Sequence, residues 1–118
     1  NTRSNLHVDV HNDGPSLTIA LGRFTGGGVF VKMDGGSSTW TVEEDCRIRG
    51  FRPGATVRGE EFDTRYRWLA FNGAEPHAVA PYIGSGRWSL VYYTCDAFNL
   101  ADPSVKAELI SLGFHMPA

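Results

Sequence analysis

The chain has 118 residues and a mass of 12.9 kDa, which is enough for one domain but too little for two hydrophobic cores. Hydrophobic residues make up 42%, charged residues 20%, and the mean hydropathy is −0.23, so the composition is globular rather than disordered or fibrous. A net charge of −2 excludes a diffuse basic field, so any contact with nucleic acid must be local.

The cysteines and the length of the apolar runs exclude further classes of protein. Cys46 and Cys95 form no CxxC motif, which excludes a disulfide scaffold and a cysteine-based zinc module but assigns no compartment. No run approaches the roughly 18 apolar residues of a membrane helix, so we expect no membrane partner. The first residue is Asn1 rather than Met, and we expect an upstream segment to have been removed.

Glycine-rich turns between short β-branched or aromatic runs predict an all-β chain. In chain order we expect strands at residues 6–10, 16–21, 29–33, 40–43, 56–62, 65–71, 77–82 and 87–94. Glycine-rich bends or turns are expected at residues 22–28, 34–38, 72–73 and 84–86. Asp102 and Pro103 predict the start of a helix that ends at Gly113 and covers the sheet.

The first predicted strand places an imidazole and a carboxylate on one face. His7 and Asp9 are two positions apart, so their Cα atoms should lie about 6.5–7 Å from each other, which suits one metal ion. A straight strand would put His11 about 13 Å from His7, which is too far to share the ion directly. We interpret both His11 and His115 as structural or solvated residues. His77 begins a late strand that folding can return to the first, which predicts the two-histidine, one-carboxylate set of non-haem Fe(II) sites. The alternative is a surface or core pair that binds no metal.

A second pair on a predicted strand is suited to an anion. Arg87 and Ser89 share a face, and a guanidinium with a hydroxyl can hold a carboxylate through charge-assisted hydrogen bonds. The same face continues through Val91, Tyr93 and Cys95, so the clamp and the aromatic should look into one cavity. The alternatives are that Tyr93 belongs to the core and that Cys95 is a small buried residue.

The ordered set His7-x-Asp9, His77 and Arg87-x-Ser89 resembles the 2-oxoglutarate- and Fe(II)-dependent oxygenases, which are double-stranded β-helix (jelly-roll, cupin-like) proteins. This resemblance implies that the metal ligands are His7, Asp9 and His77, and that Arg87 and Ser89 hold the distal carboxylate of the cosubstrate 2-oxoglutarate. It implies a dioxygenase that hydroxylates a C–H bond.

The segments HVDVHN at 7–12 and RWSLVYY at 87–93 are similar to the TET/JBP branch of that family, whose members oxidise the 5-methyl group of cytosine or thymine in nucleic acid. This similarity implies that Asn12 contacts the target base and that Tyr93 stacks on it. Cys95 stands where the TET-like pattern has a histidine. The favoured partner is DNA with a flipped 5-methylcytosine, which would imply a nuclear protein.

Two alternatives keep other functions open. The same chemistry could act on a peptide side chain or a small molecule, or the chain could be a non-catalytic cupin-like binding module. Four arginines in residues 43–63, namely Arg47, Arg49, Arg52 and Arg58, suggest a nucleic-acid contact. Six acidic residues in the same segment give it a net charge of −2, so we interpret it as a solvated hairpin.

The start of the chain is short for this family. Six residues precede His7, whereas family members have a strand and helices before the His-x-Asp strand. We therefore expect residues 1–118 to form a single catalytic jelly-roll domain that either lacks an upstream strand and helices, supplied by another chain or segment, or is a reduced version.

Overall fold

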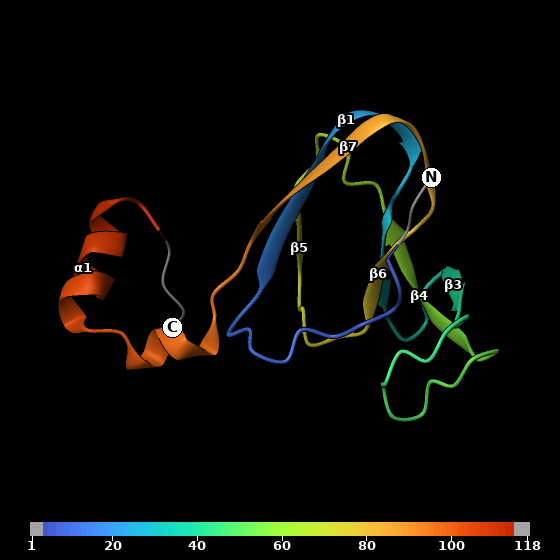
Figure 1. Cartoon of the computed structure of the whole chain (residues 1–118), viewed down its shortest axis with the longest axis horizontal. Coiled ribbons are helices and arrows are strands. Elements are labelled where there is room, and N and C mark those ends of the chain that lie inside the picture. Colours follow the sequence, from blue (N-terminus) through green and yellow to red (C-terminus); the bar gives the residue numbers. More distant parts are fainter. Residues whose placement is uncertain (1–3, 115–118) are drawn as a thin grey trace.

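The computed structural model describes residues 4–114, so His115 lies outside the described residues. This part of the chain is mostly β, with antiparallel strand pairs in a three-stranded sheet, β5-β1-β7, and a four-stranded sheet, β3-β4-β2-β6 (Figure 1). The strands are β1 (Ser16–Gly26), β2 (Val29–Lys32), β3 (Ser38–Thr41), β4 (Thr56–Phe62), β5 (Leu69–Phe71), β6 (His77–Val79) and β7 (Tyr82–Tyr92). The all-β prediction is confirmed at this level.

Strands β1 and β7 form one long arched ribbon (Figure 1), paired from Leu17 opposite Tyr92 to Gly26 opposite Tyr82. The bend predicted at residues 22–28 and the turn predicted at residues 84–86 are therefore wrong for most of their length. Their glycines serve close strand approach instead, because a Cβ at Gly22 would collide with the carbonyl oxygen of Gly86.

The segment predicted as the first strand is not a strand. It is an extended stretch beside β6, joined by one bridge in which the His7 N–H donates to the His77 carbonyl at 3.0 Å and the His77 N–H donates back at 2.9 Å. The Asp9 N–H then donates to the Gly73 carbonyl at 2.8 Å, outside any strand. Alternation of residue types predicted extension here, but extension without continued pairing gives no strand.

Two other predicted strands are shorter than expected. The strand expected over residues 65–71 is reduced to β5, because Tyr66 adopts φ +56° in a turn before it. The strand expected over residues 77–82 ends at Val79, and β7 begins only at Tyr82.

The hydrophobic core lies on the four-stranded sheet. Its fully buried members come from the N-terminal segment, three strands and the loop after β3: Leu6, Phe30, Val42, Val57 and Ala78. Side chains of the β3–β4 loop, including Ile48 and Phe51, pack against this cluster. Because Leu6 is held in the core, the residues that follow it are placed at the edge of β6.

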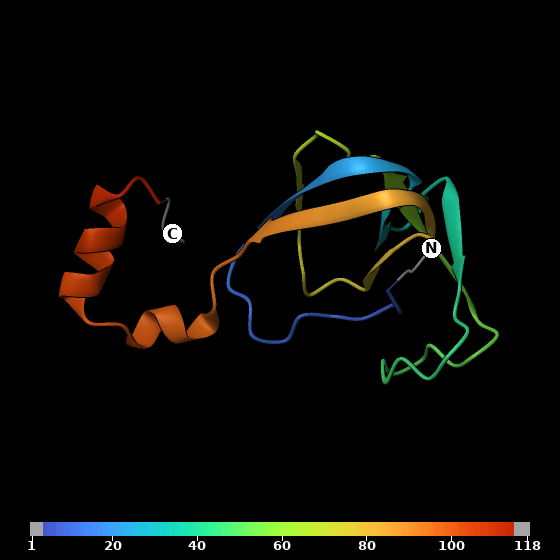
Figure 2. The same ribbon diagram turned by 45° about the horizontal axis from the view of Figure 1, so that its top comes forward.

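Helix α1 (Pro103–Ser111) begins where the sequence predicts, with Pro103 in its first turn and Gly113 at φ +93° just beyond its end. The prediction that it covers the sheet is wrong. None of its residues is buried, and it stands apart from both sheets in two views (Figures 1 and 2). A short 3₁₀-helix, Asp96–Leu100, carries the chain away from the end of β7. Among residues 4–114, no helix has the length and apolar character that crossing a membrane requires.

Candidate functional site

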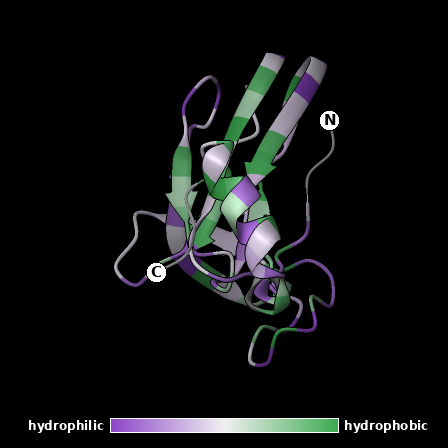
Figure 3. Cartoon of the chain, turned by 90° about the vertical axis from the view of Figure 1, so that its left-hand side faces the viewer, coloured by the Kyte–Doolittle hydropathy of each residue, from purple (hydrophilic) through white to green (hydrophobic). Residues whose placement is uncertain are grey.

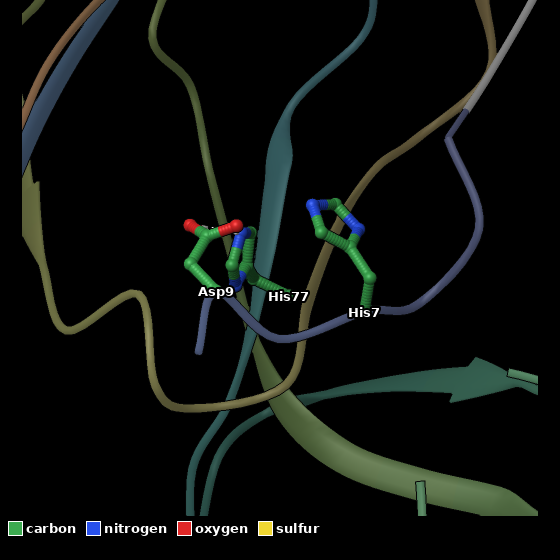
Figure 4. Close-up of side chains that lie close together, drawn as sticks. All are labelled: His7, Asp9 and His77. Atoms are coloured by element: carbon green, nitrogen blue, oxygen red, sulfur yellow. Dashed lines mark ion pairs between the residues drawn. The ribbon is translucent and has the colours of Figure 1, made fainter. Parts of the chain in front are cut away.

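Two histidines and an aspartate converge where the N-terminal segment runs beside β6. One ligand atom from each of His7, Asp9 and His77 lies within 4.8 Å of the others, and the three side chains gather at one place (Figure 4). The bridge between His7 and His77 puts their rings on one face, with centroids 4.3 Å apart. The structure thus brings together the three residues that the sequence predicts as metal ligands, although a single bridge rather than a strand positions them.

Both imidazoles are fixed by backbone carbonyls two residues earlier in the chain. The Nδ1 atom of His7 lies 2.7 Å from the Asn5 carbonyl oxygen, and that of His77 lies 2.8 Å from the Glu75 carbonyl oxygen. A carbonyl can only accept, so in the neutral form of each ring the proton sits on Nδ1 and the Nε2 lone pair is left for another partner. Such a hydrogen bond to the far nitrogen is the usual support of a metal-bound histidine. Sequence reasoning missed these carbonyls, because backbone acceptors leave no mark in residue type.

The electrostatics of the cluster favour a cation. Burial, above all, lowers the pKa of His77, and His7 lowers it further, against opposing contributions from the Glu75 carbonyl and Asp9. A neutral His77 directs its Nε2 lone pair at Oδ2 of Asp9, 3.4 Å away. Two acceptors then face each other without a proton between them, and a metal ion would satisfy both.

The Asp9 carboxylate is itself confined. The Asn12 amide donates to Oδ2 of Asp9 at 3.4 Å and lies equally close to the Ser16 hydroxyl. On the other side, a Cβ at Gly73 would lie 2.8 Å from Oδ2 of Asp9 and 3.1 Å from the Asn12 amide nitrogen. Gly73 is therefore a part of the site that sequence reasoning interpreted only as a turn residue.

Arg87 on β7 forms the anion-binding end. Its guanidinium donates to the Ser89 hydroxyl at 2.7 Å and to the Gly27 carbonyl at 2.9 Å, and its central carbon lies 5.4 Å and 5.7 Å from the ring centroids of Phe24 and Tyr82. Its Nε is buried without a hydrogen-bond partner among the described residues. Burial lowers the pKa of this guanidinium, yet arginine stays ionised, so a fixed positive charge lines this end of the cavity.

One cavity of about 660 Å³ joins both ends. Every side chain that the sequence predicts for the site lines it: His7, Asp9, Asn12, His77, Arg87, Ser89, Tyr93 and Cys95. Its walls are otherwise largely apolar, with Phe71, Val29 and Val91 among them. A ligand in this half-open cavity would meet both the histidine–aspartate cluster and the arginine.

The residues predicted to contact substrate lie where the segment after Asp9 meets the end of β7. Asn12 and Cys95 form a backbone bridge, so the two side chains are neighbours. Tyr93 is 61% exposed and Cys95 is exposed and free, so the alternatives that placed them in the interior are wrong. His11 is exposed, pairs with Asp96 at 3.2 Å and does not join the ligand cluster, as expected.

The arginines of the β3–β4 loop lie away from this cavity. Arg47, Arg49 and Arg52 are exposed and line a separate hollow of about 670 Å³ at the loop surface. Arg58 on β4 donates to the Gly36 carbonyl at 2.9 Å. The predicted solvated segment agrees with the exposure of the three loop arginines.

Comparison of the chain with protein families, curated proteins and solved structures gives no match. The chemistry and geometry of the cavity are therefore the basis on which a function can be inferred.

Proposed function

We propose that the chain is an Fe(II)- and 2-oxoglutarate-dependent dioxygenase, with its two sheets forming part of a double-stranded β-helix. One observation carries the proposal: a single cavity is lined by a two-histidine, one-carboxylate cluster and, apart from it, by an arginine that is held beside a serine hydroxyl. The favoured reaction is hydroxylation of the 5-methyl group of a modified pyrimidine in nucleic acid.

The donor set fits Fe(II). His7 and His77 would bind through Nε2 and Asp9 through a carboxylate oxygen, and three protein ligands leave further coordination positions open. When bound there, Fe(II) with 2-oxoglutarate supplies oxidation of a C–H bond by O₂, coupled to decarboxylation of the oxoacid to succinate. The carbonyls of Asn5 and Glu75 hold both rings in the required tautomer.

The arginine end fits a carboxylate. Arg87 supplies a fixed positive charge that an anion would neutralise, and the Ser89 hydroxyl beside it lies 2.7 Å from the guanidinium. The flanking aromatic rings hold the guanidinium in place, and apolar walls suit the methylene carbons of a short dicarboxylate. A diacid such as 2-oxoglutarate matches a site with a metal cluster at one position and a fixed cation at another.

The substrate assignment rests on the cavity residues that lie where the segment after Asp9 meets the end of β7. Exposed Tyr93 offers a ring for stacking on an extruded base. The amide nitrogen of Asn12 faces Asp9 and Ser16, so its side-chain oxygen would accept a hydrogen bond from a base edge. Cys95, beside Asn12, presents a thiol where the TET-like pattern has a histidine. Contacts with the base edge would therefore differ from those of the TET-like pattern.

The test is turnover with Fe(II), 2-oxoglutarate and an oligonucleotide that carries 5-methylcytosine. We expect succinate in step with 5-hydroxymethylcytosine, both measured by mass spectrometry, and loss of both in Asp9→Ala. Asp34→Ala is the matched control, because Asp34 is a fully exposed aspartate that does not line the cavity. Succinate release that is independent of the oligonucleotide would move the substrate to a peptide or small molecule. No succinate with any substrate class, despite metal binding, would favour the binding-module alternative.

A further inference from the structure

The face of the β1–β7 ribbon that points away from the cavity is apolar. Thr18, Ser89 and Val91 line the cavity, so alternation turns their neighbours to the opposite side. Three cross-strand pairs occupy that side: Leu17 with Tyr92, Ile19 with Leu90, and Leu21 with Trp88. Trp88 is 74% exposed, and Trp68 extends the surface through a ring contact with Tyr92 at 5.7 Å. We call these seven residues the outer apolar face.

Strand β1 is inverted relative to the usual pattern of a half-buried strand. Its cavity side carries the small or polar residues Ser16, Thr18 and Ala20, which are buried, whereas its other side carries leucine, isoleucine and leucine. A strand ordinarily turns its larger apolar side chains toward a packed layer. Five side chains of the outer apolar face are exposed, and Ile19 and Leu21 are half-buried. A contiguous apolar surface of this kind marks an interaction site.

The chain also carries a segment that lacks a packing surface. After β7, residues 96–114 form an arm made of the 3₁₀-helix and α1, and none of the α1 residues is buried. Apolar side chains of this arm are exposed: Leu100, Val105, Ile110, Leu112 and Phe114. Figure 3 shows hydrophobic and hydrophilic residues interspersed along the helix that faces the viewer.

Charge favours contact between the arm and the ribbon. The arm contains Asp96, Asp102 and Glu108 against Lys106, a net charge of −2. Strands β1, β5 and β7 contain no acidic residue, and their charged residues are Arg23 and Arg87. Arg23 shares the outward alternation of Leu21, so a basic group borders the outer apolar face.

We propose that the occupant of this face is the arm of a second copy of the chain. Each copy would lay α1 on the outer apolar face of its partner, and twofold symmetry would bury both faces and both arms at once. The arm leaves the end of β7 in a direction away from its own sheets (Figures 1 and 2). This direction favours exchange of arms between two copies over an arm that folds back onto its own sheet. The proposal is independent of the metal site.

The first test is the oligomeric state of the full chain by sedimentation velocity over a range of concentrations. We expect a dimer whose dissociation constant rises about tenfold or more in Trp88→Asp and in Ile110→Asp, since each places a charge within the contact. Met33→Asp is the control, because Met33 is 42% exposed and lies outside both surfaces. A monomer at every concentration, or a dimer that neither variant weakens, would overturn the proposal.

The second test separates exchange from folding back and does not depend on how well the aspartate variants fold. Leu90→Cys and Ile110→Cys are made in separate chains, mixed and oxidised, and the disulfide is located by peptide mass spectrometry. We expect a disulfide between position 90 of one chain and position 110 of the other. No such product in the mixture, together with an intrachain disulfide in the double variant, would show that the arm covers its own sheet and would overturn the exchange.

Discussion

His77 presents Nε2 to Oδ2 of Asp9 at 3.4 Å while its Nδ1 lies 2.8 Å from the carbonyl oxygen of Glu75. The carbonyl fixes the proton on Nδ1, and burial favours the neutral ring by lowering the pKa of His77. The lone pair of the histidine and the negative charge of the aspartate therefore share one small space. This relationship makes metal binding the first property to measure.

Replacing His77 with glutamine should reduce the affinity for Mn²⁺ or Fe²⁺ by about 100-fold or more, because the variant loses a donor that is already oriented. Anaerobic isothermal titration calorimetry measures the change. His11→Gln removes an exposed imidazole outside the cluster and should keep the affinity of the unmodified chain. Equal weakening by both variants would mean that the three-residue cluster is not the binding site.

Gly73→Ala should lower metal affinity about tenfold and destabilise the fold by about 1 kcal/mol, because the new Cβ would lie 2.8 Å from Oδ2 of Asp9. Gly73 does not have a positive φ, so the cost comes from crowding rather than backbone strain. Gly86→Ala is a matched control, since its Cβ would meet its nearest neighbour, Nε1 of Trp88, at an ordinary 3.7 Å. Calorimetry and thermal unfolding check both variants, and unchanged affinity in Gly73→Ala would contradict the confinement of Asp9.

The sequence predicts strands best where local alternation continues along one paired strand. The predicted strand at residues 56–62 matches β4 fully, and the alternation at residues 16–21 marks the first part of β1. The glycine segments that extend β1 and β7 were missed, because tolerance of close strand approach appears only when two distant segments are paired. The prediction that α1 covers the sheet was wrong for a related reason, because helical spacing defines a helix but not the surface on which it packs.

For the site, residue type was enough to nominate the polar side chains but not to explain their placement. The meeting of His7 with His77 depends on a pairing between positions 70 residues apart, which no local pattern encodes. The carbonyl oxygens that orient both rings and the missing side chain of Gly73 are backbone features. The orphaned Nε of Arg87 likewise follows from three-dimensional packing.

Arg87→Lys should weaken 2-oxoglutarate binding about 10- to 100-fold and leave metal binding unchanged. A lysine keeps the charge but loses the planar fork that contacts Ser89 and Gly27 together and the donor at Nε. Calorimetric titration of 2-oxoglutarate into the Mn²⁺-loaded chain measures the effect. Arg23→Lys, at an exposed position on the same ribbon, is the matched control. Unchanged binding in Arg87→Lys would remove the arginine from the anion-binding site.

We expect Glu60 to account for part of the loss of folding stability at acid pH. Hydrogen bonds from the backbone N–H and then the hydroxyl of Ser37, at 2.6 Å and 2.9 Å, lower the pKa of Glu60. A carboxyl whose pKa is lower in the folded state than in the unfolded state stabilises the fold above the unfolded pKa, and this contribution is lost as the pH falls through the folded pKa.

Ser37→Ala should therefore raise the pKa of Glu60 part of the way toward its ordinary value, because the hydroxyl is lost while the backbone donor remains. Glu60→Gln should flatten the fall of unfolding free energy in the same acid range. NMR titration of the carboxyl carbon and urea unfolding at several pH values check the two variants. A Glu60 pKa that does not move in Ser37→Ala would show that the hydroxyl makes no contribution to the charged form.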